Sequence, residues 1–199
     1  MAIRDRLLGT RAGYSLFRRV IKADRHMQWL LDDHIKPASG TRLLDVGCGT
    51  GDLAQLIPEV TYVGIDHNPA YLSTTANVGG PEFVHADLAD MARLDIGTFD
   101  TVVALGVIHH LDDDIARHVV SEVRRRLVPG GRFVTVDPVF HPDQRSTARV
   151  LMALDRGRFV RHPPDYERLM RSSFDDVEVT VRFDLNPFPY THCIMTGTA

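Results

Sequence analysis

A short apolar run that leads into three alternating glycines constrains this chain more than any other feature. Residues 42–46 have the composition of a short buried strand, and Gly47, Gly49 and Gly51 follow directly. Glycines in such a turn allow backbone dihedrals that other residues avoid, and they let a ligand approach the main chain closely. A helix beginning near Gly51 would add free N–H groups and a positive dipole end. The pattern predicts a strand, loop and helix that bind a polar or anionic ligand.

Strands and helices alternate downstream of this loop, after a helix expected over residues 13–36. Apolar and β-branched segments predict further parallel strands at residues 61–65, 82–84, 99–105 and 132–136. Turn residues and amphipathic spacing predict helices near residues 52–57, 112–127 and 164–172, and one that begins at Asn68-Pro69. The last two strands, 177–183 and 192–198, are joined by so short a loop that we expect them to be antiparallel. The sequence therefore predicts an α/β fold, Rossmann-like and doubly wound, with a mostly parallel seven-stranded sheet and an antiparallel last strand.

The spacing of the glycines narrows the class of ligand. The loop reads G-x-G-x-G, whereas a dinucleotide fingerprint reads G-x-G-x-x-G and a P-loop needs a Lys followed by Ser or Thr. Asp66 ends the second expected strand, about 20 residues after Gly47, where an acidic residue accepts hydrogen bonds from ribose hydroxyls. Several cofactors carry a ribose, so Asp66 by itself does not identify the ligand.

Four segments in order resemble one known family. Asp45-Val46-Gly47-Cys48-Gly49-Thr50-Gly51 resembles motif I of the class I S-adenosylmethionine-dependent methyltransferases, whose loop passes beside the phosphate-free amino-acid part of the cofactor. His85-Ala86-Asp87-Leu88 is similar to the segment placed near the adenine, and Ala104–Leu111 resembles motif IV. Leu127–Phe133 resembles the turn before the fifth strand, so that the resemblance covers about residues 40–137. It implies a methyltransferase with S-adenosylmethionine as cofactor.

The resemblance also implies which residues bind that cofactor. Tyr14 would contact it from a helical lid, and Cys48 is interpreted as a small residue that fits the loop rather than as a nucleophile. The two cysteines lack metal-site spacing, and no metal site is predicted. The expected cofactor-binding residues are Tyr14, Asp45, Gly47, Cys48, Gly49, Gly51, Asp66, His67, Ala86, Asp87, Leu88 and Leu105.

Three histidines are candidates for a general base. His110 follows the fourth expected strand, His141 follows the fifth, and His192 begins the last. Ligands bind at the carboxyl edge of such sheets, and a histidine titrates near neutral pH. A structural or cofactor-pocket role for His110, and surface or packing roles for His141 and His192, are the alternatives.

Composition bears on the substrate and on partners. The net charge of −3 lacks the basic excess usual in nucleic-acid binders. We therefore expect a small-molecule substrate, no nucleic-acid partner, no membrane partner and a cytoplasmic location; the oligomeric state is not predicted.

We expect one methyltransferase domain over 1–199, with a helical lid (1–40), a cofactor-binding core (41–137), a substrate-side insertion and helix (138–172) and a C-terminal hairpin (173–199). A repurposed fold with a non-methylating reaction, a nonenzymatic cofactor-binding domain, and a protein or RNA methyltransferase stay open as alternatives.

Overall fold

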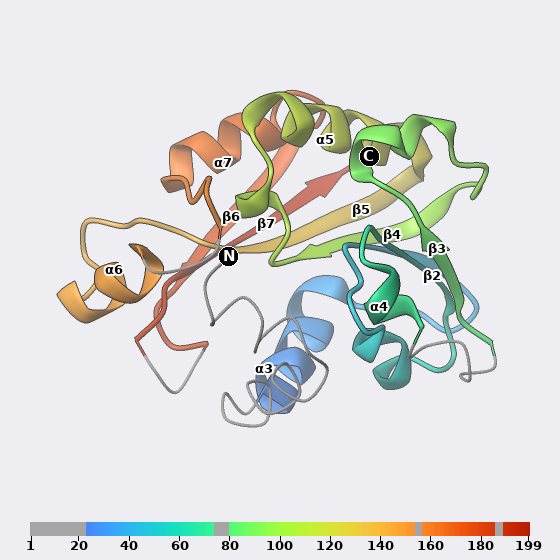
Figure 1. Ribbon diagram of the computed structural model, residues 1–199, viewed down its shortest axis with the longest axis horizontal. Helices are drawn as coiled ribbons and strands as arrows, with labels where there is room; N and C mark the ends of the chain where they lie inside the picture. The colour runs from blue at the N-terminus through green and yellow to red at the C-terminus, as the bar shows by residue number, and fades with distance from the viewer. Residues whose placement is uncertain (1–22, 74–79, 154–156, 186–188) are drawn as a thin grey trace.

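A seven-stranded sheet organises the molecule. The computed structural model describes residues 23–73, 80–153, 157–185 and 189–199, so that Tyr14 and the start of the expected first helix lie outside the described residues. The strands are β1 (Arg42–Val46), β2 (Thr61–Asp66), β3 (Glu82–His85), β4 (Phe99–Leu105), β5 (Leu127–Pro138), β6 (Asp176–Arg182) and β7 (His192–Thr198). Their order is β3-β2-β1-β4-β5-β7-β6 (Figure 1). β1 to β5 are parallel to one another, whereas β7 runs antiparallel to both β5 and β6, which confirms the expected fold class.

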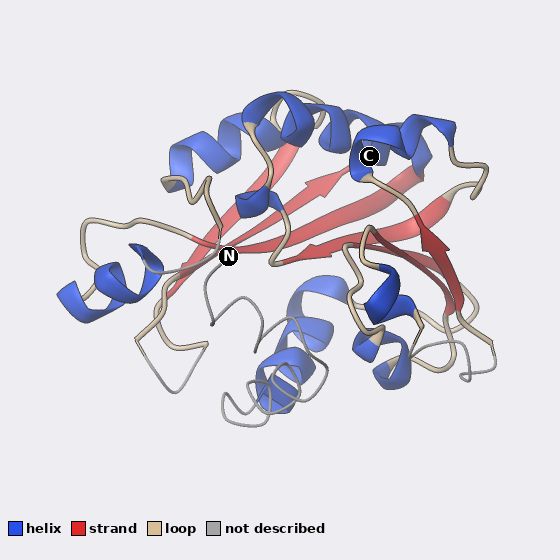
Figure 2. Cartoon of the chain, viewed as in Figure 1, coloured by secondary structure: helices blue, strands red, loops and turns tan. Residues whose placement is uncertain are grey.

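Helices cover both faces of this sheet (Figure 2). α5 (Asp113–Arg126) and α7 (Pro163–Met170) pack on one face, and α3 (Ala23–Leu30) with the π-helical turn η1 (Leu31–Ile35) lies on the other (Figure 1). Short one- to two-turn elements complete the layers: η2 (Asp52–Leu56), α4 (Pro69–Leu72), η3 (Leu88–Arg93) and η4 (Ile108–His110). α6 (Ser146–Ala153) projects from one end of the molecule (Figure 1). The central strands are therefore buried on both sides.

Buried apolar side chains form two hydrophobic cores, one on each face of the sheet, because side chains alternate between the faces along the central strands. Leu43 packs with the α3 and η1 side, while Leu44 packs with the α5 and α7 side. Val102 and Val103 of β4 divide in the same way. A strand covered on both faces needs apolar residues at successive positions, which is the composition these segments have.

Three local features differ from the sequence-based expectation. The helix expected after Gly51 is a 3-10 helix of five residues, η2, and α6 lies in a segment for which no element was expected. The expected turn at residues 129–131 lies inside β5, where Leu127 pairs with Phe99 but Arg132 pairs with Thr101. The residues between Leu127 and Arg132 therefore loop out of the ladder as a bulge.

The helical segment that precedes β1 is held against the last strands. The Arg182 guanidinium of β6 lies 4.4 Å from the ring centroid of Trp29, and the His34 ring meets Trp29 edge-on at 4.9 Å. Arg132 donates a hydrogen bond of 2.7 Å to the carbonyl oxygen of Ile35, which satisfies an acceptor at the end of η1. This packing holds α3 and η1 against β5 and β6.

Candidate functional site

The glycine loop after β1 has a geometry that only glycine tolerates. Gly47 has a φ of 73°, and a Cβ added there would lie 2.6 Å from Cγ2 of Val107. Gly49 has a φ of 56°, but a Cβ added there would meet nothing within 4 Å. Gly47 is therefore required by a close approach inside the protein, whereas Gly49 borders open space that a ligand can use.

Asp66 fixes the loop from the end of β2. Its carboxylate is buried and accepts hydrogen bonds of 2.8 Å from the N–H of Gly49 and from the N–H of Asn68. The N–H groups of Gly47 and Cys48 donate to the carbonyl oxygen of Ile65 at 2.8 and 3.0 Å. These bonds place the acidic residue directly beside the loop, as the sequence predicts.

Asp45 lies under the loop in a buried position that is 4% exposed. The hydroxyl of Tyr62 donates a hydrogen bond of 2.7 Å to its Oδ2. Burial raises the pKa of Asp45 to about 7, the Tyr62 hydrogen bond opposes that rise, and the nearby charge of Asp66 adds to it. Tyr62 was not among the expected site residues, because nothing in its local sequence pairs it with Asp45.

Cys48 is an inert thiol in this loop. It is buried, and burial together with the charges of Asp45 and Asp66 raises its pKa well above the usual range. A nucleophilic cysteine needs the opposite environment, so this geometry favours its interpretation as a small packing residue. Its Sγ would lie 2.8 Å from a Cβ at Gly64, so the thiol packs tightly against β2.

The remaining expected cofactor residues line the neighbouring strand ends. His67 follows Asp66 and its side chain is 80% exposed, with Nδ1 at 3.7 Å from Asp66 Oδ1. The N–H of Ala86 donates to the carbonyl oxygen of Asp66 at 3.2 Å, which places the end of β3 against the end of β2. Asp87 caps η3 through the N–H of Ala89, and Leu88 begins that helix. Leu105 ends β4 at the same edge of the sheet.

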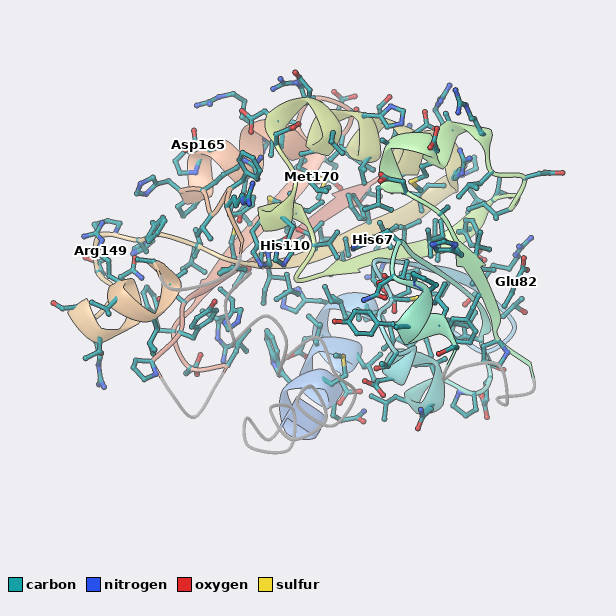
Figure 3. All side chains as sticks on the ribbon, in the orientation of Figure 1. His67, Glu82, His110, Arg149, Asp165 and Met170 are labelled. Carbon is teal, nitrogen blue, oxygen red and sulfur yellow. The ribbon has the colours of Figure 1, made fainter. Side chains whose placement is uncertain are left out.

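The two adjacent histidines after β4 have different surroundings. His110 is exposed and lies beside the ends of the central strands (Figure 3). His109 is buried: its Nδ1 lies 2.8 Å from Asp137 Oδ1, which also accepts the His109 N–H at 3.1 Å. The two imidazole centroids are 4.0 Å apart. Asp137 thus fixes His109, and His109 supports the ring of His110.

His141 and His192 lie at the carboxyl end of β5. His141 is half-buried, its ring meets Phe183 edge-on at 5.3 Å, and its Nδ1 accepts the N–H of Asp143 at 3.2 Å. His192 pairs with Pro138 of β5 and its ring lies 5.2 Å from that of Tyr190. The antiparallel β7 therefore brings His192 to the edge where β4 and β5 end, as the sequence predicts.

A buried arginine ties the segment after α6 to this edge. Arg161 is 8% exposed and donates five hydrogen bonds. The acceptors are Oδ1 of Asp113 and the carbonyl oxygens of Ile108, Leu111 and Phe159. The N–H of Phe159 in turn donates to the carbonyl oxygen of His109 at 3.0 Å. Residues 157–161 are thereby fixed over the turn that carries the two histidines.

We compared the sequence with models of known protein families to identify the kind of domain that contains this site. Residues 44–133 match the model of a family described as a methyltransferase domain. This stretch, just under half of the chain, is similar to methyltransferase domains. The matched region runs from β1 to the middle of β5 and contains the glycine loop, Asp66 and both histidines after β4.

Curated relatives of this chain have different names. An uncharacterized methyltransferase of Mycobacterium tuberculosis is 35% identical over 119 residues, which cover 57% of this chain and 58% of that protein. A demethylmenaquinone methyltransferase of Symbiobacterium thermophilum is 29% identical over 143 residues, 62% of this chain and 54% of the relative. A human protein named probable tRNA methyltransferase 9B is 33% identical over 96 residues, 48% of this chain and 21% of the relative. The matches therefore span about half or less of these relatives.

Solved structures share the fold at low identity. A phosphoethanolamine N-methyltransferase of Haemonchus contortus, solved with S-adenosyl-L-methionine, has a TM-score of 0.75 and 16% identity, covering 98% of this chain and 58% of that one. An S-adenosylmethionine-dependent methyltransferase of Archaeoglobus fulgidus has a TM-score of 0.71 and 18% identity, covering 94% and 99%. At such identities the likeness establishes the fold alone.

Two negative findings concern the described residues. Within residues 23–73, 80–153, 157–185 and 189–199, no three His, Cys, Asp or Glu side chains are grouped as metal ligands. None of the helices in these ranges is both long and apolar enough to cross a membrane.

Proposed function

We propose that this chain transfers the methyl group of S-adenosylmethionine to a nucleophilic atom of a small-molecule metabolite. The observation that carries the proposal is the pairing of Gly49 with Asp66: a backbone N–H is held by a buried carboxylate while the Cα faces open space. A cofactor with a ribose and a cationic amino-acid part suits that pairing, because a carboxylate accepts hydroxyl hydrogen bonds and attracts positive charge.

The residues present fit that cofactor. Asp66 would hold the ribose hydroxyls, because each of its oxygens accepts a single backbone N–H and retains a further lone pair. The loop from Gly47 to Gly51, above Asp45, would border the amino-acid part. Ala86, Asp87 and Leu88 would lie along the adenine, as the family resemblance implies, and His67 and Leu105 would flank the same edge.

The bound cofactor would supply a methyl group already activated by a positively charged sulfur. The protein then needs mainly to align the acceptor atom with the methyl carbon, and such alignment can supply several kcal/mol of the barrier. A base is useful where the acceptor is a hydroxyl or a protonated amine. His110, His141 and His192 are the proposed candidates, because His110 and His141 follow β4 and β5 and His192 begins β7 at this edge.

Residues 138–172 and 173–199 would recognise the acceptor in this proposal. The net charge of −3 favours a small metabolite over a nucleic acid. The relatives named above include both a demethylmenaquinone methyltransferase and a probable tRNA methyltransferase. A screen for the methyl acceptor must therefore include both small molecules and tRNA.

Cofactor binding is the first test. Calorimetry should show binding of S-adenosylmethionine and of S-adenosylhomocysteine but no binding of NAD. Asp66→Ala should weaken both affinities by about 1.5–3 kcal/mol, the range for hydrogen bonds to a charged group. The matched control is Asp114→Ala, whose carboxylate is 95% exposed and pairs with Arg117 within α5. Binding of NAD without any response to S-adenosylhomocysteine would refute the assignment.

The acceptor is sought with labelled methyl groups. The protein and labelled S-adenosylmethionine are incubated with metabolite extracts and, separately, with total tRNA. Label in a small-molecule fraction supports the proposal, whereas label in tRNA alone would reject the small-molecule acceptor and keep the methyltransferase. Tight cofactor binding with no transfer in any fraction would favour the repurposed or nonenzymatic alternatives.

A further inference from the structure

Most of the exposed large apolar side chains lie at one end of the molecule. In the part of the chain that the structure describes, the large apolar residues that are exposed are Leu56, Val150, Leu151, Phe159 and Phe183. All except Leu56 belong to α6, to the segment after α6 or to the residue that follows β6, and these segments lie at the same end of the molecule (Figure 1). Single apolar residues on a surface are ordinary, whereas several gathered together are typical of a contact surface.

α6 has a fixed position in a segment that projects from the domain. The segment leaves and rejoins the domain at one place, because the N–H of Phe140 donates to the carbonyl oxygen of Arg161 at 3.0 Å. Gln144 joins the start of the segment to the helix: its Oε1 accepts the N–H of His141 at 2.7 Å, and its Nε2 lies 3.1 Å from Sδ of Met152. The outer face of α6 is therefore held in one orientation relative to the sheet.

That outer face of α6 is apolar. Ala148 and Met152 are one helical turn apart and are 2% and 1% exposed, so they mark the inner face. Val150 lies midway between them in sequence and therefore on the opposite side of the helix, where it is 58% exposed. Leu151 beside it is 39% exposed. The helix thus presents two aliphatic side chains outward instead of burying them.

Arginines without a partner flank these apolar residues. Arg145, Arg149 and Arg158 are exposed, and within the described residues none of them makes a side-chain hydrogen bond or an ion pair. Arg149 lies at the opposite end of the molecule from Glu82 (Figure 3). The other arginines whose side chains are described each have a polar or aromatic partner: Arg42, Arg93, Arg117, Arg124, Arg125, Arg126, Arg132, Arg161, Arg168, Arg171 and Arg182. The unpartnered guanidinium groups are therefore confined to the surroundings of α6.

The charge of this segment is opposite to that of the whole chain. Residues 139–161 contain five arginines and two aspartates, with no lysine or glutamate, whereas the net charge of the chain is −3. Asp143 does not neutralise the unpartnered arginines, because its carboxylate is 83% exposed and lies 3.8 Å from Nδ1 of His141. A local excess of positive charge on an acidic protein attracts an anionic surface.

We propose that this end of the molecule docks onto an anionic membrane surface. The α6 surface, as we call it, consists of Arg145, Arg149, Val150, Leu151, Arg158, Phe159 and Phe183. Val150 and Leu151 enter the boundary between headgroups and acyl chains, and the guanidinium groups bind lipid phosphates. The expectation of no membrane partner rests on the lack of an apolar span, which such a contact does not need. The inference is independent of the proposed function.

A bilayer suits the α6 surface better than a folded protein partner does. A stable protein interface buries about 800 Å² on each partner and involves about 20–30 residues a side. The α6 surface offers a few apolar side chains on a projecting helix, together with cationic groups that have no partner in the described chain. Lipid binding by a helix at the interface needs only a small apolar face beside positive charge.

The first test is flotation of the full chain with extruded vesicles. One set of vesicles contains phosphatidylcholine alone, and the other is an equimolar mixture of phosphatidylcholine and phosphatidylglycerol. We expect binding to the anionic vesicles to be at least about 10-fold stronger, because each arginine near such a surface adds to the attraction. Raising the salt to about 0.5 M should weaken that binding, because the charges are then screened. Equal binding to both sets of vesicles, or to neither, overturns the inference.

Val150→Asp, with Leu56→Asp as its matched control, tests the apolar part of the surface. Leu56 is 42% exposed and belongs to η2, so both variants place the same new charge at an exposed apolar position. Val150→Asp should weaken binding to the anionic vesicles by about 10-fold or more, since a valine side chain then no longer leaves water. Leu56→Asp should change it by no more than about 2-fold. Equal losses in the two variants refute a contact through α6.

Arg149→Gln, with Arg93→Gln as its control, tests the charged part. Arg93 of η3 is 82% exposed and pairs with Asp90, so both variants remove one exposed positive charge. Arg149→Gln should weaken binding to the anionic vesicles by about 5-fold, the equivalent of about 1 kcal/mol. Arg93→Gln should have an effect of no more than about 2-fold. A larger effect of Arg93→Gln would move the contact to another face and overturn the inference.

A polarity-sensitive dye gives a second readout that does not depend on a loss of binding. Cys48 and Cys193 are buried, so a cysteine introduced at an exposed position can be labelled selectively. Dye on Val150→Cys should shift its emission to the blue when anionic vesicles are added, whereas dye on Leu56→Cys should not. A shift at both positions, or at neither, contradicts docking through α6. Self-association of the protein that Val150→Asp abolishes would assign this surface to a second copy of the chain and overturn the bilayer.

Discussion

Replacement of Arg161 by Met tests whether one buried guanidinium fixes the segment after α6 to the turn after β4. Arg161 is 8% exposed, and its five hydrogen bonds reach the Asp113 carboxylate and three backbone carbonyls. Methionine keeps much of the aliphatic stem but donates no hydrogen bond. The variant therefore removes the polar interactions with little change in packed volume.

The cost follows from what each acceptor loses. The Asp113 side chain is 63% exposed and regains water, so the loss of this ion pair adds little. The carbonyl oxygens of Leu111 and Phe159 lose a charged donor, and a buried acceptor left unpaired costs about 1–3 kcal/mol, whereas the Ile108 oxygen still accepts the N–H of Leu111. Partial entry of water reduces the sum, which gives about 2–4 kcal/mol. For a domain of this size that is a fall in Tm of roughly 4–16 °C.

Urea unfolding followed by circular dichroism, together with calorimetric melting, measures the effect. Arg168→Met is the control, because its ion pair with Asp165 is exposed on both sides, at 76% and 44%. That pair is expected to contribute no more than about 0.5 kcal/mol. If Arg161→Met and Arg168→Met destabilise the protein equally, the assignment of Arg161 as the tie between the two segments is wrong.

Three further predictions concern the loop and the candidate bases. Gly47→Ala should lower the free energy of unfolding by about 1–3 kcal/mol, since its Cβ meets Val107 at 2.6 Å at a positive φ, and chemical denaturation measures this. The pKa of Asp45 is raised to about 7 in the folded state, so its contribution to stability is present at low pH and is lost as the pH rises through 7. Asp45→Asn should therefore gain stability relative to wild type from the ordinary value of 3.8 up to about pH 7 and level off above it, and a constant difference would reject that pKa. Alanine at one of the three candidate histidines should lower the rate of transfer by about 100-fold or more with cofactor affinity retained, whereas near-normal turnover in all three rejects a histidine base.

The sheet could be predicted from sequence because its strands have strong local signals. β7 begins and ends at the expected residues, 192 and 198, since a proline-rich turn precedes it and the apolar Cys193, Ile194 and Met195 follow its first residue. α6 was not expected, because Ala148 and Met152 give its short buried face too few apolar positions to show helical spacing. The sequence does not predict that η2 is a 3-10 helix, since a segment of five residues is too short to show a helical period.

The site could be predicted where a motif encodes it and not where distant contacts do. The glycine loop and Asp66 come together as expected because β1 and β2 are adjacent parallel strands. Sequence alone cannot distinguish His109 from His110, since the partner that buries His109 is Asp137, on the next strand of the sheet. The same reason explains why Tyr62 was missed as the donor to Asp45.

The stacking of Arg182 on Trp29 gives the molecule an optical probe of its own. Trp29 is the single tryptophan of the chain, so its emission reports one location, the contact between α3 and β6. The His34 ring lies 4.9 Å away, and burial lowers the pKa of that imidazole. A protonated imidazole quenches indole emission, so brightness should fall on acidification below the ordinary histidine range. Stopped-flow fluorescence can therefore follow the docking of this helix without any attached dye.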